Sequence, residues 1–172
     1  QGDPAAMYDL ARLYETGRGV VLSFEKASEL YTMAVEQGNV SAMNNLGNNY
    51  RNGEGVAQSF ERAVELYTMA VEQESVTGMH NLACLFRDGQ GVVQSHKQAA
   101  ELFTRAAEKG VADAMLSIGA LYYHGQGVAQ SNELAREWWT KAAAEKHEGA
   151  IKNLKILDEQ EATTATTSTT TT

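Results

Sequence analysis

Residues 42–73, AMNNLGNNYRNGEGVAQSFERAVELYTMAVEQ, contain one full copy of the pattern that decides the fold. The two glycines of its turn, Gly53 and Gly55, recur at intervals of 36 residues as Gly17/Gly19, Gly89/Gly91 and Gly125/Gly127. Further columns keep this interval: Met7, Met43, Met79 and Met115; Tyr14, Tyr50, Phe86 and Tyr122; Ser23, Ser59, Ser95 and Ser131; Tyr31, Tyr67, Phe103 and Trp139. A register that stays constant over four copies indicates tandem structural repeats.

Each repeat is predicted to contain two helices. Apolar residues at helical spacing place the first helix at about residues 6–16, and Gly17 follows where a left-handed C-cap residue is needed. Ser23 suits the N-cap of a second helix that continues to about Gln37 and stops at Gly38. Helix pairs of this length bury a continuous core only by stacking on their neighbours. The predicted fold is therefore all-α: an α/α solenoid, a right-handed superhelix of helix-turn-helix repeats.

The G-x-G pairs do not indicate a dinucleotide-binding turn. Such a turn needs a third glycine and a preceding strand, whereas each pair here follows a predicted helix. The C-cap requirement accounts for the first glycine of every pair.

The repeated string resembles a Sel1-like repeat, a relative of the tetratricopeptide repeat. The family pattern has Ala, Leu-Gly and Tyr in the first helix, Gly-x-Gly-Val in the turn, and Ala, an aromatic residue and Ala in the second helix. The matching positions are Ala42, Leu46, Gly47, Tyr50, Gly53, Gly55, Val56, Ala63, Tyr67 and Ala70. The resemblance covers residues 1 to about 158, with Ser at the usual acidic N-cap and Ala or Val at the usual Pro as departures. It implies a protein-binding adaptor or scaffold without catalysis.

Three segments are expected along the chain. Residues 1–4 align with the end of a second helix, so we expect a truncated repeat there and at least one more repeat upstream. A gene that encodes only a leader sequence before Gln1 would overturn this expectation. Residues 5–160 are predicted to form the solenoid, four repeats and a capping helix in which Lys155 and Asp158 replace apolar stacking residues. Residues 161–172 are predicted to form a disordered Thr-rich tail.

Composition narrows the range of partners. The net charge of −8 argues against nucleic acid and anionic membranes, which bind basic surfaces. No stretch has the apolar length for membrane insertion, and the first residues do not resemble a signal peptide. The single cysteine, Cys84, excludes an intrachain disulfide framework and weakly favours a reducing compartment. We therefore expect other proteins as partners, with no cofactor and no metal.

Motifs for chemistry are sparse. No metal-ligand spacing surrounds any of the four histidines, His80, His96, His124 and His147. Cys84 shows no readable Cys–His pairing and is expected to be an inert structural thiol. Trp139 falls in the register of the second-helix aromatic column, so it is expected to pack in the core.

Five asparagines between residues 44 and 52 are unusual in a helix, because Asn favours caps and turns. At about 100° per residue, four of them fall on the face that the core does not use. Asn49 is the exception; it lies at the edge of the core and is expected to cost stability. The resemblance to tetratricopeptide-type solenoids implies that the non-core face lines a concave groove. The predicted partner-binding residues are Asn44, Asn45, Asn48, Arg51, Asn52, His80, Asn81, Arg87, Leu116, Tyr123 and His124.

This groove suits an extended peptide segment. Asn side chains can pair with its backbone, and Arg51 and Arg87 can receive a carboxylate. Leu116, Ala120 and Tyr123 can take an apolar anchor. The alternative is that Arg51 pairs with Asp88 and the asparagines are only solvated. The predicted function is a non-catalytic protein-interaction scaffold. A regulatory or localising module of a larger enzyme, with its catalytic domain outside this fragment, is the alternative.

One junction between repeats differs from the others. Glu74 stands where repeats one and three have Gly38 and Gly110, and Gly78 replaces the Ala that begins the other first helices. A non-glycine residue in the left-handed region costs about 1–2 kcal/mol, and glycine within a helix up to about 1 kcal/mol. Residues 73–79 are therefore predicted to be the softest junction of the array.

Overall fold

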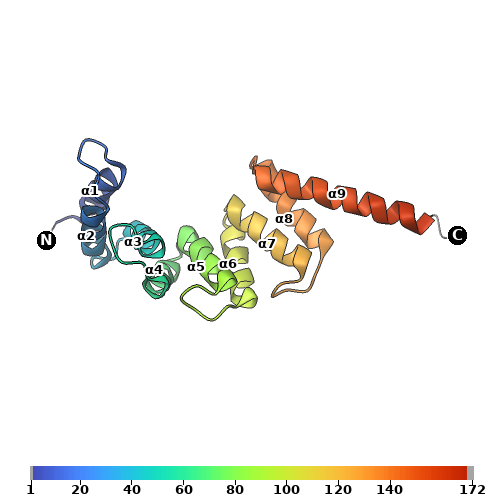
Figure 1. Ribbon diagram of the computed structural model, residues 1–172, viewed down its shortest axis with the longest axis horizontal. Coiled ribbons are helices and arrows are strands. Elements are labelled where there is room, and N and C mark those ends of the chain that lie inside the picture. The colour runs from blue at the N-terminus through green and yellow to red at the C-terminus, as the bar shows by residue number, and fades with distance from the viewer. Residues whose placement is uncertain (1, 170–172) are drawn as a thin grey trace. The chain divides into compact units, whose positions relative to one another are not determined.

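The computed structural model describes residues 2–169, and within them it contains nine helices and no strand. In chain order these are α1 (Pro4–Thr16), α2 (Phe24–Val35), α3 (Val40–Asn52), α4 (Phe60–Glu72), α5 (Val76–Asp88), α6 (His96–Glu108), α7 (Ala112–His124), α8 (Asn132–Ala144) and α9 (Glu148–Thr169) (Figure 1). The predicted all-α class and the two helices per repeat are confirmed. Within this part of the chain, no helix combines the length and apolar character that crossing a membrane requires.

The chain folds into two compact units, Gln1–Ser95 with α1 to α5 and His96–Thr172 with α6 to α9. Within each unit, every helix packs against the next one along the chain (Figure 1). Such nearest-neighbour stacking is the arrangement of an α/α solenoid. The boundary falls inside the third repeat, since α5 and α6 are its two helices. The right-handed sense of the superhelix remains a prediction.

The predicted caps begin and end the helices. The hydroxyls of Ser23, Ser59 and Ser131 accept hydrogen bonds of 3.1–3.2 Å from the backbone N–H groups three residues further on. The first helices end at glycines in the left-handed conformation, with φ between 65° and 76°: Gly17, Gly53, Gly89 and Gly125. Both cap types satisfy backbone groups that a helix end leaves without partners.

In the second, third and fourth pairs, the second glycine has a packing role that was not predicted from the sequence. A Cβ at Gly55 would lie 2.1 Å from the carbonyl oxygen of Phe24, the first residue of α2. A Cβ at Gly91 would lie 2.5 Å from the carbonyl carbon of Phe60, the first residue of α4. The turn of one repeat thus presses against the start of the second helix of the preceding repeat, and only glycine permits this approach.

The aromatic column forms the centre of the core, as predicted. Tyr31, Tyr67 and Phe103 are fully buried, and Trp139 is nearly so. Small first-helix residues make room for these rings: a Cβ at Gly47 would lie 2.5 Å from the ring of Tyr67. The aromatic side chains of the second helices therefore pack directly against first-helix backbone.

The irregular junction after repeat two has the predicted backbone strain. Glu74 has φ of 59°, and Lys146 at the end of repeat four has φ of 61°. Glycine at position 78 makes the helix less stable, but the packing requires it. A Cβ at this position would lie 2.9 Å from Cβ of Ala70. Close contact between α4 and α5 therefore requires glycine at this position. The predicted softness of residues 73–79 stays a prediction.

The last helix is longer than the sequence predicts. A capping helix is predicted to end near residue 160, but α9 continues to Thr169. The helix therefore includes residues 161–169 of the predicted disordered tail, and residues 170–172 lie outside the described residues. Extending a formed helix adds hydrogen bonds without a new nucleation step, which favours this continuation. Arg136 of α8 contacts this helix through Asp158 (2.6 Å) and Glu161 (2.8 Å). The division into three segments remains a prediction.

Candidate partner-binding surfaces

The first-helix face is the predicted partner-binding side of the first helices α1, α3, α5 and α7. Between α1 and α3, Tyr31 holds two side chains of these helices in place. Its buried ring comes from α2, and its hydroxyl donates to Oε2 of Glu15 (3.0 Å) and accepts from Nδ2 of Asn45 (2.8 Å). A carboxylate only accepts hydrogen bonds, so the tyrosine proton points to Glu15 and Asn45 presents its amino group. Oδ1 of Asn45 has no protein partner among the described residues and is left for a ligand or solvent.

Tyr67 of α4 holds a side chain of α3 that in turn contacts α5. Its hydroxyl donates to Oδ1 of Asn48 at 2.7 Å, and Nδ2 of Asn81 donates to the same oxygen at 3.3 Å. One amide thereby connects α3, α4 and α5. The amino group of Asn48 and the carbonyl oxygen of Asn81 are not used in these two bonds. Asn45, Asn48 and Asn81, called here the amide row, are thus positioned by buried tyrosines or by each other.

Burial keeps both tyrosines protonated. Desolvation raises the pKa of Tyr31 strongly, although the hydrogen bond from Asn45 opposes the shift. Desolvation also raises the pKa of Tyr67 to about 12, although the charge of Arg51 opposes the shift. Both hydroxyls therefore remain hydrogen-bond donors well above neutral pH.

Asn44 does not belong to this surface, which corrects the prediction. It is 6% exposed, and its Nδ2 donates to the carbonyl oxygen of Val40 and to Oγ of Ser75, both at 2.9 Å. A Cβ at Gly78 would lie 3.2 Å from its Oδ1. The prediction considered a single helix, whereas the start of α5 covers Asn44 in the folded unit.

Asn49 lies in the core and not at its edge. It is fully buried, and its Nδ2 donates to Oγ of Ser28 in α2 at 2.9 Å. The Ser28 hydroxyl in turn donates to the carbonyl oxygen of Glu54 at 3.3 Å. Within the described part of the chain, Oδ1 of Asn49 has no hydrogen-bond partner. The predicted cost in stability remains to be measured.

The two arginines of the predicted surface differ in their neighbours. Arg87 binds Asp88 through two contacts, Nε to Oδ1 at 2.7 Å and Nη2 to Oδ2 at 3.0 Å, and this hydrogen bonding raises the pKa of Arg87. Arg51 donates from Nε to Oδ1 of Asn52 at 3.4 Å, a neutral partner. Asp88 therefore pairs with its neighbour in α5 and not with Arg51. Arg51 is the better placed of the two to attract an acidic ligand.

His80 and Cys84 form a pair that the sequence analysis missed. In α5 the Sγ atom of Cys84 lies 4.0 Å from Nε2 of His80. The signal was present in the sequence, because residues four positions apart lie on one face of a helix. The prediction that Cys84 lacks a histidine partner is therefore wrong.

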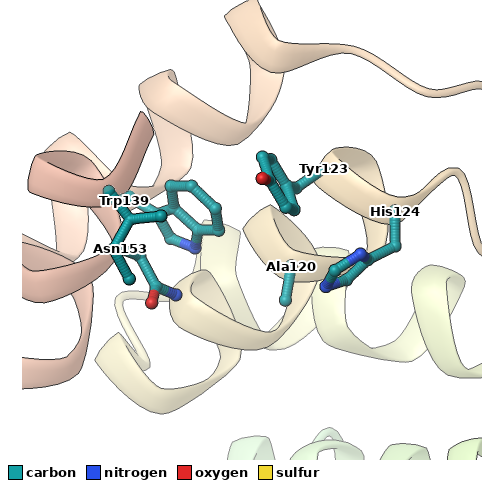
Figure 2. A pocket seen from close by; sticks show the side chains of 6 residues that line it. Ala120, Tyr123, His124, Trp139 and Asn153 are labelled. Carbon is teal, nitrogen blue, oxygen red and sulfur yellow. The ribbon is translucent and has the colours of Figure 1, made fainter. Parts of the chain in front are cut away.

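The second unit contains a pocket of about 200 Å³ that is lined by residues of α7, α8 and α9. Its lining residues are Ala120, Tyr123, His124, Trp139, Asn153 and Ile156 (Figure 2). The ring centroids of Tyr123 and Trp139 are 5.6 Å apart, and those of Tyr123 and His124 are 4.8 Å apart in an edge-on arrangement. The Tyr123 hydroxyl donates to Oε1 of Gln160 at 2.5 Å, which fixes the ring against α9.

The structure thus brings together two of the three predicted site residues of this unit. Tyr123 and His124 line the pocket, whereas Leu116 is not among its lining residues. The carbonyl oxygen of Leu116 accepts from Nε1 of Trp139 at 3.1 Å, and its side chain lies next to Gly149 of α9. The pocket residues of α9 were not predicted, because this helix was expected only to cap the solenoid.

Stacked helix pairs that expose amide, basic and aromatic side chains on the first-helix face define a helical-repeat protein. The sequence profile of the Sel1 repeat matches residues 4–39, 40–75, 76–111 and 112–147. The chain therefore belongs to the Sel1 repeat family, whose members generally act as protein-interaction scaffolds and are typically non-catalytic. A search of curated protein sequences gave no significant match.

Solved structures agree with this assignment. The chain is similar to a protective antigen of uropathogenic Escherichia coli with an SLR fold (33% identity, TM-score 0.81), covering 84% of this chain and 31% of that one. A Sel1 repeat protein from Oxalobacter formigenes is 32% identical with a TM-score of 0.82, covering 88% of this chain and 63% of that one. An immunity protein from Pseudomonas aeruginosa is 25% identical with a TM-score of 0.60, covering 84% and 54%. The chain thus spans less than two thirds of the length of each of these proteins.

Proposed function

We propose that this protein is a non-catalytic scaffold that binds an extended segment of a partner protein on its first-helix face. The amide row carries the proposal. Asn45 offers an acceptor, Asn48 a donor and Asn81 an acceptor, while their remaining groups are held within the fold. The backbone of an extended peptide also presents alternating donors and acceptors, so it can pair with such a row.

The hydrogen bonds between the buried tyrosines and the amide row favour the binding of a ligand. A side chain that is already held in its binding conformation loses less conformational entropy when the ligand arrives. Tyr31 and Tyr67 are fully buried, and they hold Asn45 and Asn48 by bonds of 2.8 and 2.7 Å. We therefore expect binding to need little rearrangement of this face.

The chemistry of the ligand follows from the neighbours of the row. Arg51 favours an acidic group, and an exposed ion pair of this kind contributes about 0.2–1 kcal/mol. In the second unit, the pocket beside Tyr123 and Trp139 suits an apolar or aromatic side chain. The proposed partner segment thus has an acidic part and an apolar part, each with its own contact.

A peptide selection tests this proposal. A phage-displayed library is selected on the purified chain, and the affinities of the selected peptides are measured by calorimetry. We expect acidic residues to be enriched, and we expect Arg51→Gln to weaken binding by about two- to fivefold, the equivalent of one exposed ion pair. Arg62→Gln is the matched control, because Arg62 lies on α4 in an exposed ion pair with Glu65. Peptides that lose affinity with Arg62→Gln and not with Arg51→Gln would refute the proposed surface.

A further inference from the structure

The third repeat has a lysine at a position where the other three repeats have a glutamate. Glu25, Glu61 and Glu133 lie in the first turn of their second helices, and each accepts a hydrogen bond of 2.9–3.1 Å from the hydroxyl of the N-cap serine. The first turn of a helix attracts negative charge and repels positive charge. Lys97, in the first turn of α6, therefore gives up a contact that stabilises the equivalent helices.

Within the described residues 2–169, no ion pair of Lys97 compensates this loss. The side chain of Lys97 is exposed and pairs with no carboxylate of this part of the chain. Glu101 follows four residues later on α6, but a lysine that precedes a glutamate is the weaker order for a helical ion pair. A residue that breaks a local rule without a gain for the fold is expected at a functional site.

Tyr122 of α7 also differs from its equivalents. Tyr50 lies under the guanidinium group of Arg62, with Cζ 5.8 Å from the ring centroid. The equivalent tyrosine of the first repeat lies under a lysine at 5.2 Å. In the fourth repeat Leu134 takes the position of this cation. Among the described residues, the hydroxyl of Tyr122 has no hydrogen-bond partner.

Lys97 and Tyr122 line one pocket of the second unit. Its volume is about 520 Å³, and it lies between α6 and the turn that follows α7. Gly127 of this turn packs against the start of α6, because a Cβ there would lie 2.5 Å from the backbone nitrogen of Lys97. Val128 adds apolar surface to the lining, and Arg105 adds a second cation. The pocket thus combines positive charge, a tyrosine and apolar surface.

We infer that this pocket binds a small amphipathic carboxylate, in which a carboxyl group is attached to an apolar chain or ring. Lys97 attracts the carboxylate, and the hydroxyl of Tyr122 donates a hydrogen bond to it. The apolar body of the ligand packs against the ring of Tyr122 and against Val128.

Charge and size support this class of ligand. Two cations and one acid, Glu101, line the pocket, so its lining is positive in a protein whose net charge is −8. Such complementarity favours an anion over a cation. The volume of about 520 Å³ also falls within the range of about 300–1,000 Å³ that is typical of small-molecule sites. The amide row lies on α3 and α5, so this site does not depend on the proposed peptide.

An NMR titration of the full ¹⁵N-labelled chain tests the inference. The probe is phenylbutyrate, and phenylbutanol is the matched ligand with the same apolar body and no charge. We expect the acid to bind with a Kd of at most about 2 mM and to shift the amides of α6 and of the turn after α7. The alcohol should bind at least about tenfold more weakly, because it lacks the charge-assisted contacts.

Two variants locate the ligand. Lys97→Glu and Tyr122→Phe introduce residues that the same positions hold in other repeats, so both proteins are expected to fold, which circular dichroism checks. We expect Lys97→Glu to weaken binding of the acid at least about fivefold and Tyr122→Phe to weaken it about tenfold. Lys152→Glu makes the same charge change on exposed α9, outside the pocket lining, and should leave the Kd unchanged. A Kd of the acid above about 2 mM, equal affinity for acid and alcohol, or an unchanged Kd in Lys97→Glu would each overturn the inference.

Discussion

The hydroxyl of Tyr67 donates a 2.7 Å hydrogen bond to the side-chain oxygen of Asn48, joining the buried core to the exposed face of the first helices. The tyrosine is a core residue by burial, and the asparagine is half-buried on the proposed binding surface. A change in one is therefore expected to affect the other. The stability of the core and the order of the binding surface are linked at this contact.

Stability should fall at alkaline pH because of this tyrosine. Its pKa is raised to about 12 in the folded protein, against about 10 for an unperturbed tyrosine. Its contribution is therefore complete below pH 10 and is lost as pH rises towards 12, with a slope of up to about 1.4 kcal/mol per pH unit. Urea unfolding at a series of pH values between 9 and 12 measures this loss.

Tyr67→Phe should make the decline of the unfolding free energy with pH less steep, because the ionisable group is gone. The Tyr31 hydroxyl adds to the decline with the same sign, so some slope remains in Tyr67→Phe. Identical slopes for the wild-type protein and Tyr67→Phe would show that this hydroxyl is not buried as described.

Gly55→Ala should destabilise the protein more than Gly53→Ala. Both positions have left-handed backbone, so each alanine carries about 1–2 kcal/mol of conformational strain. Only at position 55 would the methyl group also lie 2.1 Å from the backbone of Phe24. We expect the difference to exceed about 2 kcal/mol in denaturant unfolding, because backbone has to move to relieve the overlap. Equal losses would contradict the close-approach role of the second glycine.

Asn49 and Ser28 should behave as a buried polar pair. Asn49→Ala removes the partner of Ser28 and leaves a cavity, for which we expect a loss of about 2–3 kcal/mol. The double variant Ser28→Ala/Asn49→Leu replaces both groups with apolar ones, as Leu85 and Leu121 do in later repeats, and should match or exceed the wild-type stability. A double variant less stable than Asn49→Ala would refute this interpretation.

Glu74→Gly should stabilise the protein. Glu74 has φ of 59°, and relief of this strain is partly offset by the greater freedom of glycine in the unfolded chain. A net gain of about 0.5–1 kcal/mol is expected from chemical denaturation. Glu72→Gly, at the last residue of α4, is the matched control and should lose up to about 1 kcal/mol. If residues 73–79 are the softest junction, their amides should also exchange faster than those of residues 37–43.

Local features of the fold were predictable from the sequence. The Ser N-caps and left-handed Gly C-caps depend on a few neighbouring residues, and the aromatic column followed from a period of 36. These features need only chain geometry and hydrophobic burial. The His80–Cys84 pair was equally local, and helical spacing alone would have revealed it.

Features that depend on how one repeat meets the next were not predictable. Asn44 faces away from the core of its own helix pair, yet the start of α5 buries it. Gly55 and Gly91 are required by backbone from the preceding repeat, which a cap signal does not report. The pocket beside Trp139 also needs Asn153 and Ile156 from α9. In each case the missing information was the packing between helices of different repeats.

The central claim, that the first-helix face binds the partner, is tested most directly by site-specific photo-crosslinking. A photoreactive phenylalanine derivative is placed at Asn52, exposed at the end of α3, or at Glu72, exposed at the end of α4. Each protein is irradiated with a selected peptide, and the crosslinked fraction is measured by mass spectrometry. We expect efficient crosslinking from position 52 and little from position 72. Crosslinking from position 72 with none from position 52 would contradict the account.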